Sequence, residues 1–117
     1  MPERNYSLRA TEWLDFQALV FNHIETYCTP QYGDKGEDPC TNYTDIEFAK
    51  QIEKYIKRYG KNSREGQQQL DILKIAHYAG MLYTKLTEEL ATQALNSNNP
   101  NDRYGLDQLN ILIQQKD

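Results

Sequence analysis

The sequence predicts an all-α fold, namely a small helical bundle with one long helix that is completed by association with further copies of the chain. Along three segments, apolar residues recur at intervals of three and four, which is the spacing of one helix face. No segment shows the alternation of apolar and polar residues that is typical of a half-buried strand. A chain of 117 residues fits one domain, so residues 1–117 are expected to form a single helical unit.

The first helix is expected over residues 12–27, with Thr11 as the residue that caps its N-terminus. Its predicted apolar face consists of Trp13, Phe16, Val20, Ile24 and Tyr27. Residues 28–43 contain two prolines and two glycines, so this segment is expected to be a loop. It is longer than a simple connection requires, and such loops in small domains are often functional.

A second helix is expected to begin after Thr44, because Thr44-Asp45-Ile46-Glu47 matches the capping box, in which the first and last residues cap each other. Gly60 is the expected left-handed residue at the C-terminal end of this helix. The predicted apolar face consists of Ala49, Ile52, Ile56 and Tyr59.

The longest helix is expected over residues 65–94, with Ser63 as a candidate cap. At 1.5 Å per residue it measures about 45 Å, so part of it is expected to pack against another subunit. Gly80 is unfavourable inside a helix and predicts a close helix contact at that point. The predicted buried side consists of Ile72, Ile75, Ala79, Leu82, Leu86 and Leu90.

The C-terminal part of the sequence is rich in asparagine between residues 96 and 102. This composition predicts a linker over 96–102, followed by a short last helix over 105–115.

The charge balance restricts the classes of partner. The chain carries 17 acidic and 13 basic side chains, for a formal net charge of −4. Proteins that bind duplex nucleic acid need a basic field over their surface, so we expect no duplex partner, whereas a small anion senses only local charge. No run of about 18 apolar residues is present, and the N-terminus lacks the pattern of a signal peptide. We therefore expect no membrane partner and a cytoplasmic location.

Basic residues are concentrated in the second predicted helix and form a stripe at helical spacing: Lys50, Lys54, Lys57, Arg58 and Lys61. Guanidinium forks and compact ammonium groups are the donors that phosphate groups require. The alternative is a solvated helix face whose cations favour the C-terminal end of the helix dipole. Spacing alone favours this alternative.

The third predicted helix places Asp71, Lys74 and Tyr78 on one face, with His77 beside them. A carboxylate, an ammonium and a phenol on one surface could bind a base or a ribose, or could shuttle a proton. The alternative is an ion pair within the helix beside a packed tyrosine.

Two cysteines and two histidines are sufficient in number for a zinc site. Their spacing matches no short zinc motif, so we expect no metal there and interpret Cys28 and Cys40 as free thiols. The sequence also lacks the phosphate-binding loop G-x-x-x-x-G-K-[ST] and the motifs G-x-G-x-x-G, G-x-S-x-G and H-E-x-x-H.

Eight positions in order match the pattern K-Y-x-x-R-x-G-K, a short insert and D-[LI]-x-K-x-x-x-Y: Lys54-Tyr55, Arg58, Gly60-Lys61, Asp71, Lys74 and Tyr78. In this pattern residues 51–86 resemble a core of small tailed-phage proteins, which are described as uncharacterised or as nucleotide kinases. Where that family often has Gly-Asn, this chain has Lys50-Gln51. The resemblance implies a helical domain, nucleotide-related work, a phage origin and site residues at positions 54, 58, 61, 71 and 74.

Three functional hypotheses follow. The first is a protein that holds a small phosphorylated nucleotide in a cationic pocket shared between subunits, without a cofactor and without obligatory catalysis. In a phage such a protein could sequester a nucleotide signal of host defence. The expected ligand-binding residues are Lys54, Tyr55, Lys57, Arg58, Lys61, Asp71, Lys74 and Tyr78.

The second hypothesis is a small nucleoside monophosphate kinase or other nucleotide-modifying enzyme without a phosphate-binding loop. It requires Mg²⁺, which Asp71 together with Asp34 or Asp38 could hold. The third hypothesis is a protein-interaction module that inhibits a host enzyme. A DNA mimic needs regularly spaced carboxylates, whereas the acidic residues here are scattered among lysines and arginines.

Overall fold

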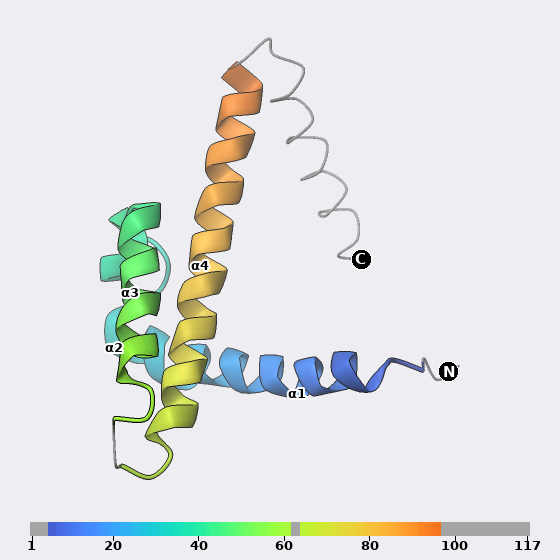
Figure 1. The fold of residues 1–117 in the computed structure, drawn as a ribbon. Coiled ribbons are helices and arrows are strands. Elements are labelled where there is room, and N and C mark those ends of the chain that lie inside the picture. The colour runs from blue at the N-terminus through green and yellow to red at the C-terminus, as the bar shows by residue number, and fades with distance from the viewer. Residues whose placement is uncertain (1–4, 62–63, 97–117) are drawn as a thin grey trace.

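A computed structural model describes residues 5–61 and 64–96 (Figure 1). These residues contain no strand, which confirms the all-α prediction. The predicted linker and last helix lie outside the described residues, as does Ser63, except that Asn96 belongs to the long helix. In chain order the elements are α1 (Leu8–His23), a π-helical turn (Ile24–Cys28), α2 (Thr29–Tyr32), a 3₁₀ turn (Pro39–Asn42), α3 (Asp45–Arg58) and α4 (Gln67–Asn96).

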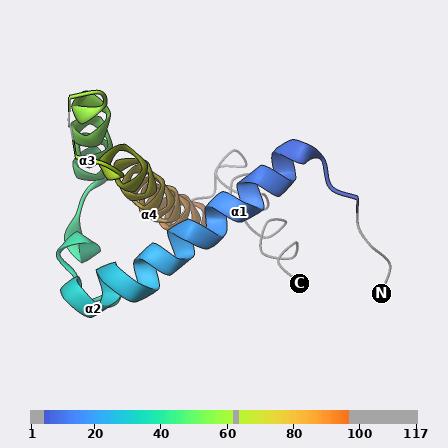
Figure 2. The same ribbon diagram turned by 90° about the horizontal axis from the view of Figure 1, so that it is seen from below.

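The helices form an antiparallel pair with a third helix laid across it. α3 and α4 run side by side in opposite directions, and α1 crosses α4 close to the N-terminal end of α4 (Figure 1). Seen from below, the N-terminal end of α1 extends away from the pair (Figure 2). No helix among the described residues is both long and apolar enough to cross a membrane.

The first helix begins four residues earlier than predicted. Ser7, in an extended conformation, is its cap and accepts a hydrogen bond from the backbone N–H of Ala10 at 3.1 Å. Thr11 is not the cap, because its hydroxyl donates to the carbonyl oxygen of Ser7 at 3.0 Å. The prediction was wrong because Leu8, which starts the helix, is exposed and lies outside the apolar face.

The helix also continues past the predicted boundary at residue 28. A π-helical turn follows α1 and leads into α2, which ends at Gly33 with φ of +95°. Pro30 does not interrupt this path, since it lies in the first turn of α2, where no backbone N–H is needed. The loop is therefore restricted to residues 33–43.

This shorter loop is held by side chains. Thr41 accepts a hydrogen bond from the N–H of Gly36 and donates one to Asp38, both at 3.0 Å. The ammonium of Lys35 lies 2.9 Å from a carboxylate oxygen of Glu88, which ties the loop to α4.

The start of α3 is as predicted. Thr44 and Glu47 form the complete capping box, with hydrogen bonds of 3.2 and 3.1 Å to each other's backbone N–H groups. The chain leaves the helix through Gly60 with φ of +78°, which confirms the left-handed residue.

The buried side of α3 differs from the prediction. The residues that α3 buries are Phe48 and Tyr55, seven positions apart, with Ile52 half-buried between them. The predicted face members Ala49, Ile56 and Tyr59 are exposed. α3 therefore carries two apolar sides, and the one with the larger aromatic rings packs inside this chain.

The close helix contact predicted at Gly80 is not found within the described part of the chain. A methyl group added there would meet no atom within 4 Å. We expect Gly80→Ala to raise the free energy of unfolding by about 0.5–1 kcal/mol, since alanine restricts the unfolded chain and suits a helix interior. Chemical denaturation measures this. Gly60→Ala is the matched control and should lower stability by about 1–2 kcal/mol, because its φ is left-handed. A destabilising Gly80→Ala would instead show that another chain approaches closely at this residue.

Candidate functional site

A cavity of about 760 Å³ lies among the described helices. Its walls come from the end of α1, the π-helical turn, α2, the 33–43 loop, α3 and the middle of α4. We call it the central cavity. Its lining is unusually rich in rings: His23, Tyr27, Tyr32, Tyr43, Phe48, Tyr55, His77 and Tyr78.

Tyr55 is the focus of this lining. Its ring is buried and stacks on that of Tyr78, with the two ring centroids 6.0 Å apart. Two ammonium groups that also line the cavity approach the same ring, Lys54 from α3 at 5.2 Å and Lys74 from α4 at 5.4 Å from the centroid. Both distances are within the range of a cation–π attraction. Both lysines thus lie beside the same ring of the cavity wall.

The guanidinium of Arg58 also lies over Tyr55, with its central carbon 5.4 Å from the ring centroid. It is turned toward Asp71, whose carboxylate oxygen is 3.7 Å from the Arg58 Nε atom. Asp71 is buried, and its other oxygen accepts a hydrogen bond of 2.7 Å from the buried amide of Gln67. This pair stands beside the central cavity and joins the ends of α3 and α4.

The eight predicted site residues therefore divide into three sets. Those that line the central cavity are Lys54, Tyr55, Lys74 and Tyr78. Arg58 and Asp71 form the neighbouring ion pair. Lys57 and Lys61 are exposed and line neither cavity described here, and the Lys57 ammonium lies 2.7 Å from Glu53, one turn away. Half of the predicted set is thus brought together.

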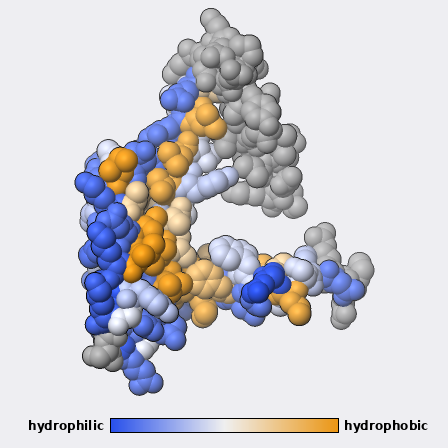
Figure 3. Space-filling model, in the orientation of Figure 1, coloured by the Kyte–Doolittle hydropathy of each residue, from blue (hydrophilic) through white to orange (hydrophobic). Residues whose placement is uncertain are grey.

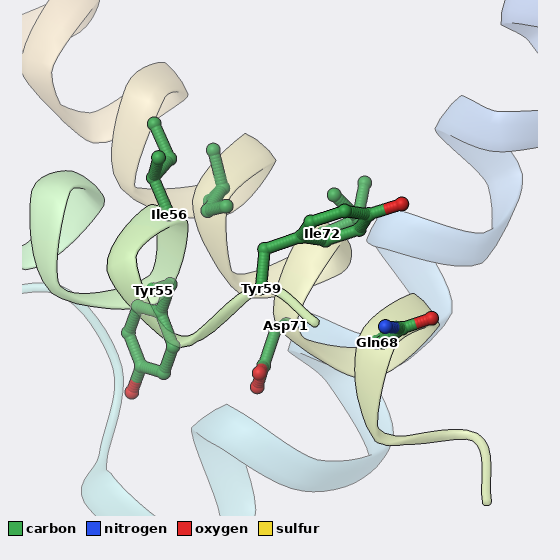
Figure 4. A pocket seen from close by; sticks show the side chains of 7 residues that line it. Tyr55, Ile56, Tyr59, Gln68, Asp71 and Ile72 are labelled. Carbon is green, nitrogen blue, oxygen red and sulfur yellow. The ribbon is translucent and has the colours of Figure 1, made fainter. Parts of the chain in front are cut away.

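A smaller cavity of about 280 Å³ lies on the other side of Tyr55, between the end of α3 and the start of α4 (Figure 4). Ile56, Tyr59, Gln68, Ile72 and Ile75 complete its lining together with Tyr55 and Asp71. In Figure 4 the Tyr55 hydroxyl and the Asp71 carboxylate point to one side and Ile56 points to the other. This cavity is mainly apolar.

The carboxylates that the kinase hypothesis assigns to Mg²⁺ line different cavities. Asp71 lines the smaller cavity, whereas Asp34 and Asp38 line the central one. The oxygens of Asp71 are also occupied by Gln67 and Arg58. Within residues 5–61 and 64–96 no three His, Cys, Asp or Glu side chains are grouped so that they could hold a metal ion.

Burial favours the neutral forms of several side chains that line the central cavity. It raises the pKa of Cys28 and Cys40, so both free cysteines remain thiols near neutral pH. Burial, and secondarily the neighbouring Tyr55, raises the pKa of Tyr78 far above its ordinary value. The Cys28 sulfur lies 3.9 Å from the Nδ1 atom of His77, a contact between residues 49 positions apart. The raised pKa of Cys28 and the lowered pKa of His77 both disfavour a thiolate–imidazolium pair at this contact.

The histidines should make stability depend on pH. Burial lowers the pKa of His77 below 6.5, with a smaller effect of His23, and burial followed by Lys74 lowers the pKa of His23. As pH falls through about 6.5, the unfolded chain gains protons that the folded chain does not, so the free energy of unfolding must fall. It stops falling once the pH is below the folded pKa values.

We expect His77→Gln to reduce this loss between about pH 7.5 and about pH 5.5, as measured by urea unfolding at both values. An unchanged loss in the variant would show that His77 is accessible to protons in the folded protein.

The net charge of the central cavity is set by its lysines and carboxylates. Four lysines, at 35, 54, 74 and 85, face three acidic residues, Asp34, Asp38 and Glu88, which leaves one positive charge. Lys35 is paired with Glu88 and Lys85 with Glu89, so Lys54 and Lys74 are the lysines of this lining that form no ion pair among the described residues. The site is thus an aromatic hollow with a cationic wall.

Fold and site together define an α-helical protein with an aromatic cavity and a pair of converging lysines. Comparisons with protein-family models, with curated proteins and with solved structures found no match to this chain. Its function must therefore be argued from the site.

The sequence did not indicate the contributions of Tyr27, Tyr43 and His23 to the cavity. The one available signal was the high content of nine tyrosines in 117 residues.

Proposed function

We propose that this protein binds a small phosphorylated nucleotide in the central cavity and holds it without converting it. The observation that carries the proposal is the convergence of the Lys54 and Lys74 ammonium groups on the Tyr55 ring at the wall of an aromatic cavity. Charge-assisted hydrogen bonds from two ammonium groups are suited to a phosphate.

The aromatic lining of the cavity is suited to the nucleobase of the proposed ligand. A nucleobase stacked on an aromatic side chain gains about 1–3 kcal/mol, and every base has a face that can stack. Tyr27, Tyr32 and Tyr43 line the cavity together with the Tyr55–Tyr78 stack. A volume of about 760 Å³ lies within the range of small-molecule sites.

Two features of the site favour binding of the nucleotide over its chemical conversion. The thiols of Cys28 and Cys40 and the phenol of Tyr78 are kept protonated by burial, so they are poor nucleophiles at neutral pH. The carboxylates expected to hold Mg²⁺ together line different cavities. The net charge of −4 of the whole chain disfavours polynucleotides.

The resemblance of residues 51–86 to tailed-phage proteins supports a more specific version of the proposal. In it, the protein is phage-encoded, acts in the host cytoplasm as a homo-oligomer and sequesters a nucleotide signal of host defence. The small number of buried hydrophobic residues among those described, Phe48, Tyr55 and Ala94, supports an oligomer, because so few cannot stabilise a domain of this length.

The test is to incubate the purified protein with mononucleotides, dinucleotides and cyclic nucleotides, remove free ligand, and release bound ligand by heat for analysis. Recovery of an intact nucleotide after tight retention is the expected result. A nucleotide altered in a Mg²⁺-dependent manner would contradict simple holding and indicate the kinase hypothesis. Retention of no nucleotide would reject the proposal and favour the interaction module.

A further inference from the structure

The 33–43 loop gives the central cavity an acidic wall. Asp34 and Asp38 of this loop line the cavity, and neither forms an ion pair among the described residues. Asp34 is exposed, whereas Asp38 is half-buried. One carboxylate oxygen of Asp38 accepts the hydrogen bond from Thr41 at 3.0 Å. A carboxylate offers about four lone-pair sites, so Asp38 retains the capacity to accept hydrogen bonds from a ligand.

The charges of the acidic loop and of the lysines act on the same interior. Burial is the main cause that raises the pKa of Cys28, and as smaller effects Lys74 lowers this pKa and Asp38 raises it. Burial and then Asp38 raise the pKa of Cys40. Both cysteines line the central cavity. Asp38 and Lys74 therefore act on one hollow from two different walls, the loop and α4.

Positive charge alone does not distinguish the cavity from the outside of the molecule. Hydrophilic side chains run along α3 in Figure 3, and Lys57 of this helix is exposed. The cavity differs because its aromatic lining contains both carboxylates and ammonium groups that form no ion pair. A matching ligand has an anionic end and an end that donates hydrogen bonds, since a carboxylate only accepts them.

The lysines limit the anionic end to one phosphate group. A phosphate monoester carries a charge of about −1.5 to −2 at pH 7. The ammonium groups of Lys54 and Lys74 together balance this charge. The two other lysines of the lining are already in ion pairs with glutamates. Further phosphates would add negative charge that no unpaired lysine of the described lining balances and that the loop carboxylates would repel.

The donating end is best supplied by guanine. Its N1–H and its N2 amino group are neighbouring donors on one edge, and a carboxylate accepts them with its two oxygens. Adenine and cytosine present one amino group beside an acceptor nitrogen. Uracil and thymine present one N–H between two carbonyl oxygens, which a carboxylate repels. A carboxylate in the wall of a nucleotide site therefore favours guanine over the other common bases.

We propose that Asp38 accepts the donor edge of a guanine base while Lys54 and Lys74 hold a single phosphate group. The ligand class is then a guanosine monophosphate. This inference rests on the proposed function, because it assigns a ligand to the same cavity. It makes Asp38 the residue that determines specificity for the base, whereas the two lysines determine the number of phosphates.

The test is isothermal titration of the wild-type protein with GMP, IMP and GTP in the absence of Mg²⁺. IMP differs from GMP only in lacking the N2 amino group, so the ratio of their dissociation constants reports the contact with the carboxylate. We expect GMP to bind at least about 10-fold more tightly than either IMP or GTP. Equal affinities for GMP and IMP, or tighter binding of GTP, would overturn the inference and leave nucleotide binding intact.

Asp38→Asn assigns the preference to this side chain. The amide keeps the size of the carboxylate and one accepting oxygen, but it loses the charge and presents a donor where guanine needs an acceptor. The preference for GMP over IMP should therefore be lost, and the affinity for GTP should approach that for GMP. Circular dichroism checks that the variant remains helical. A full preference for GMP in the folded variant would contradict the role of Asp38.

Glu37→Gln is the matched control. Glu37 belongs to the same loop and is exposed, but it does not line the cavity. Removal of its charge should leave both preferences at their wild-type values. Loss of the preferences in this variant would show that the loop charge, and not a contact with Asp38, selects the ligand. If the wild type retains other nucleotides but not GMP, this inference alone fails, whereas retention of none rejects the proposed function as well.

Discussion

Asp71→Ala is expected to lower the free energy of unfolding by about 2–3 kcal/mol, the largest stability effect that we predict for a single side chain. The carboxylate is buried and accepts a hydrogen bond from the buried Gln67 amide while facing Arg58. Its removal leaves the amide without its partner and the half-buried guanidinium without a counter-charge. Urea denaturation of the wild type and the variant measures the difference.

Glu53→Ala is the control for this prediction. The Glu53–Lys57 ion pair is short, at 2.7 Å, but both side chains are largely exposed. Solvent screens such a pair, so the variant should retain wild-type stability. If Asp71→Ala were equally harmless, Asp71 could not be the residue that joins the ends of α3 and α4.

Lys74→Met is expected to weaken nucleotide binding by about 10- to 100-fold, or about 1.4–2.8 kcal/mol. Lys74 is half-buried, and its ammonium lies beside the Tyr55 ring on the cavity wall. Methionine preserves an unbranched apolar stem and removes the charge, so the loss reports mainly the contact with phosphate. Isothermal titration with the nucleotide that the retention assay identifies measures the affinity.

Lys57→Met tests whether nucleotide binding depends on the central cavity or on the general positive charge of α3. Lys57 belongs to the same sequence stripe as Lys54, but it is paired with Glu53 and lines neither cavity. Its replacement should leave the affinity unchanged. Equal losses in both variants would show that diffuse positive charge, and not the two converging lysines, attracts the ligand.

The contrast between Lys54 and Lys57 shows what the sequence could and could not determine. Helical spacing places both in one stripe, but it does not reveal that Glu53 turns Lys57 away or that the Tyr55 ring attracts Lys54. Asp71 is similar, because its position was predicted as part of the site, whereas its pairing with Arg58 depends on how α3 meets α4.

Local signals predicted the ends of α3 well. The capping box and Gly60 act over three or four residues, so no distant contact is needed to establish them. Such local signals could not determine which of the two apolar sides of α3 is buried. Phe48 and Tyr55 face α4 and the cavity, and Ile56 and Tyr59 stay exposed, because the packing partner decides which side is covered.

The central cavity was the least predictable feature. The contact between Cys28 and His77 joins residues 49 positions apart, and much of the wall comes from residues 28–43, which have no periodicity to interpret. The predicted loop there was partly wrong because a π-helical turn continues the helix to Tyr32. Only the abundance of tyrosines hinted at an aromatic site.

The most direct test of the proposed site is a nucleotide titration followed by NMR of the tyrosine rings. Tyr55 and Tyr78 line the central cavity, whereas Tyr6 and Tyr83 are exposed and lie outside both cavities. A nucleotide held as proposed should shift the Tyr55 and Tyr78 ring resonances in a saturable way and leave those of Tyr6 and Tyr83 in place. Saturable binding that leaves Tyr55 and Tyr78 unchanged would contradict the assignment of the nucleotide to this cavity.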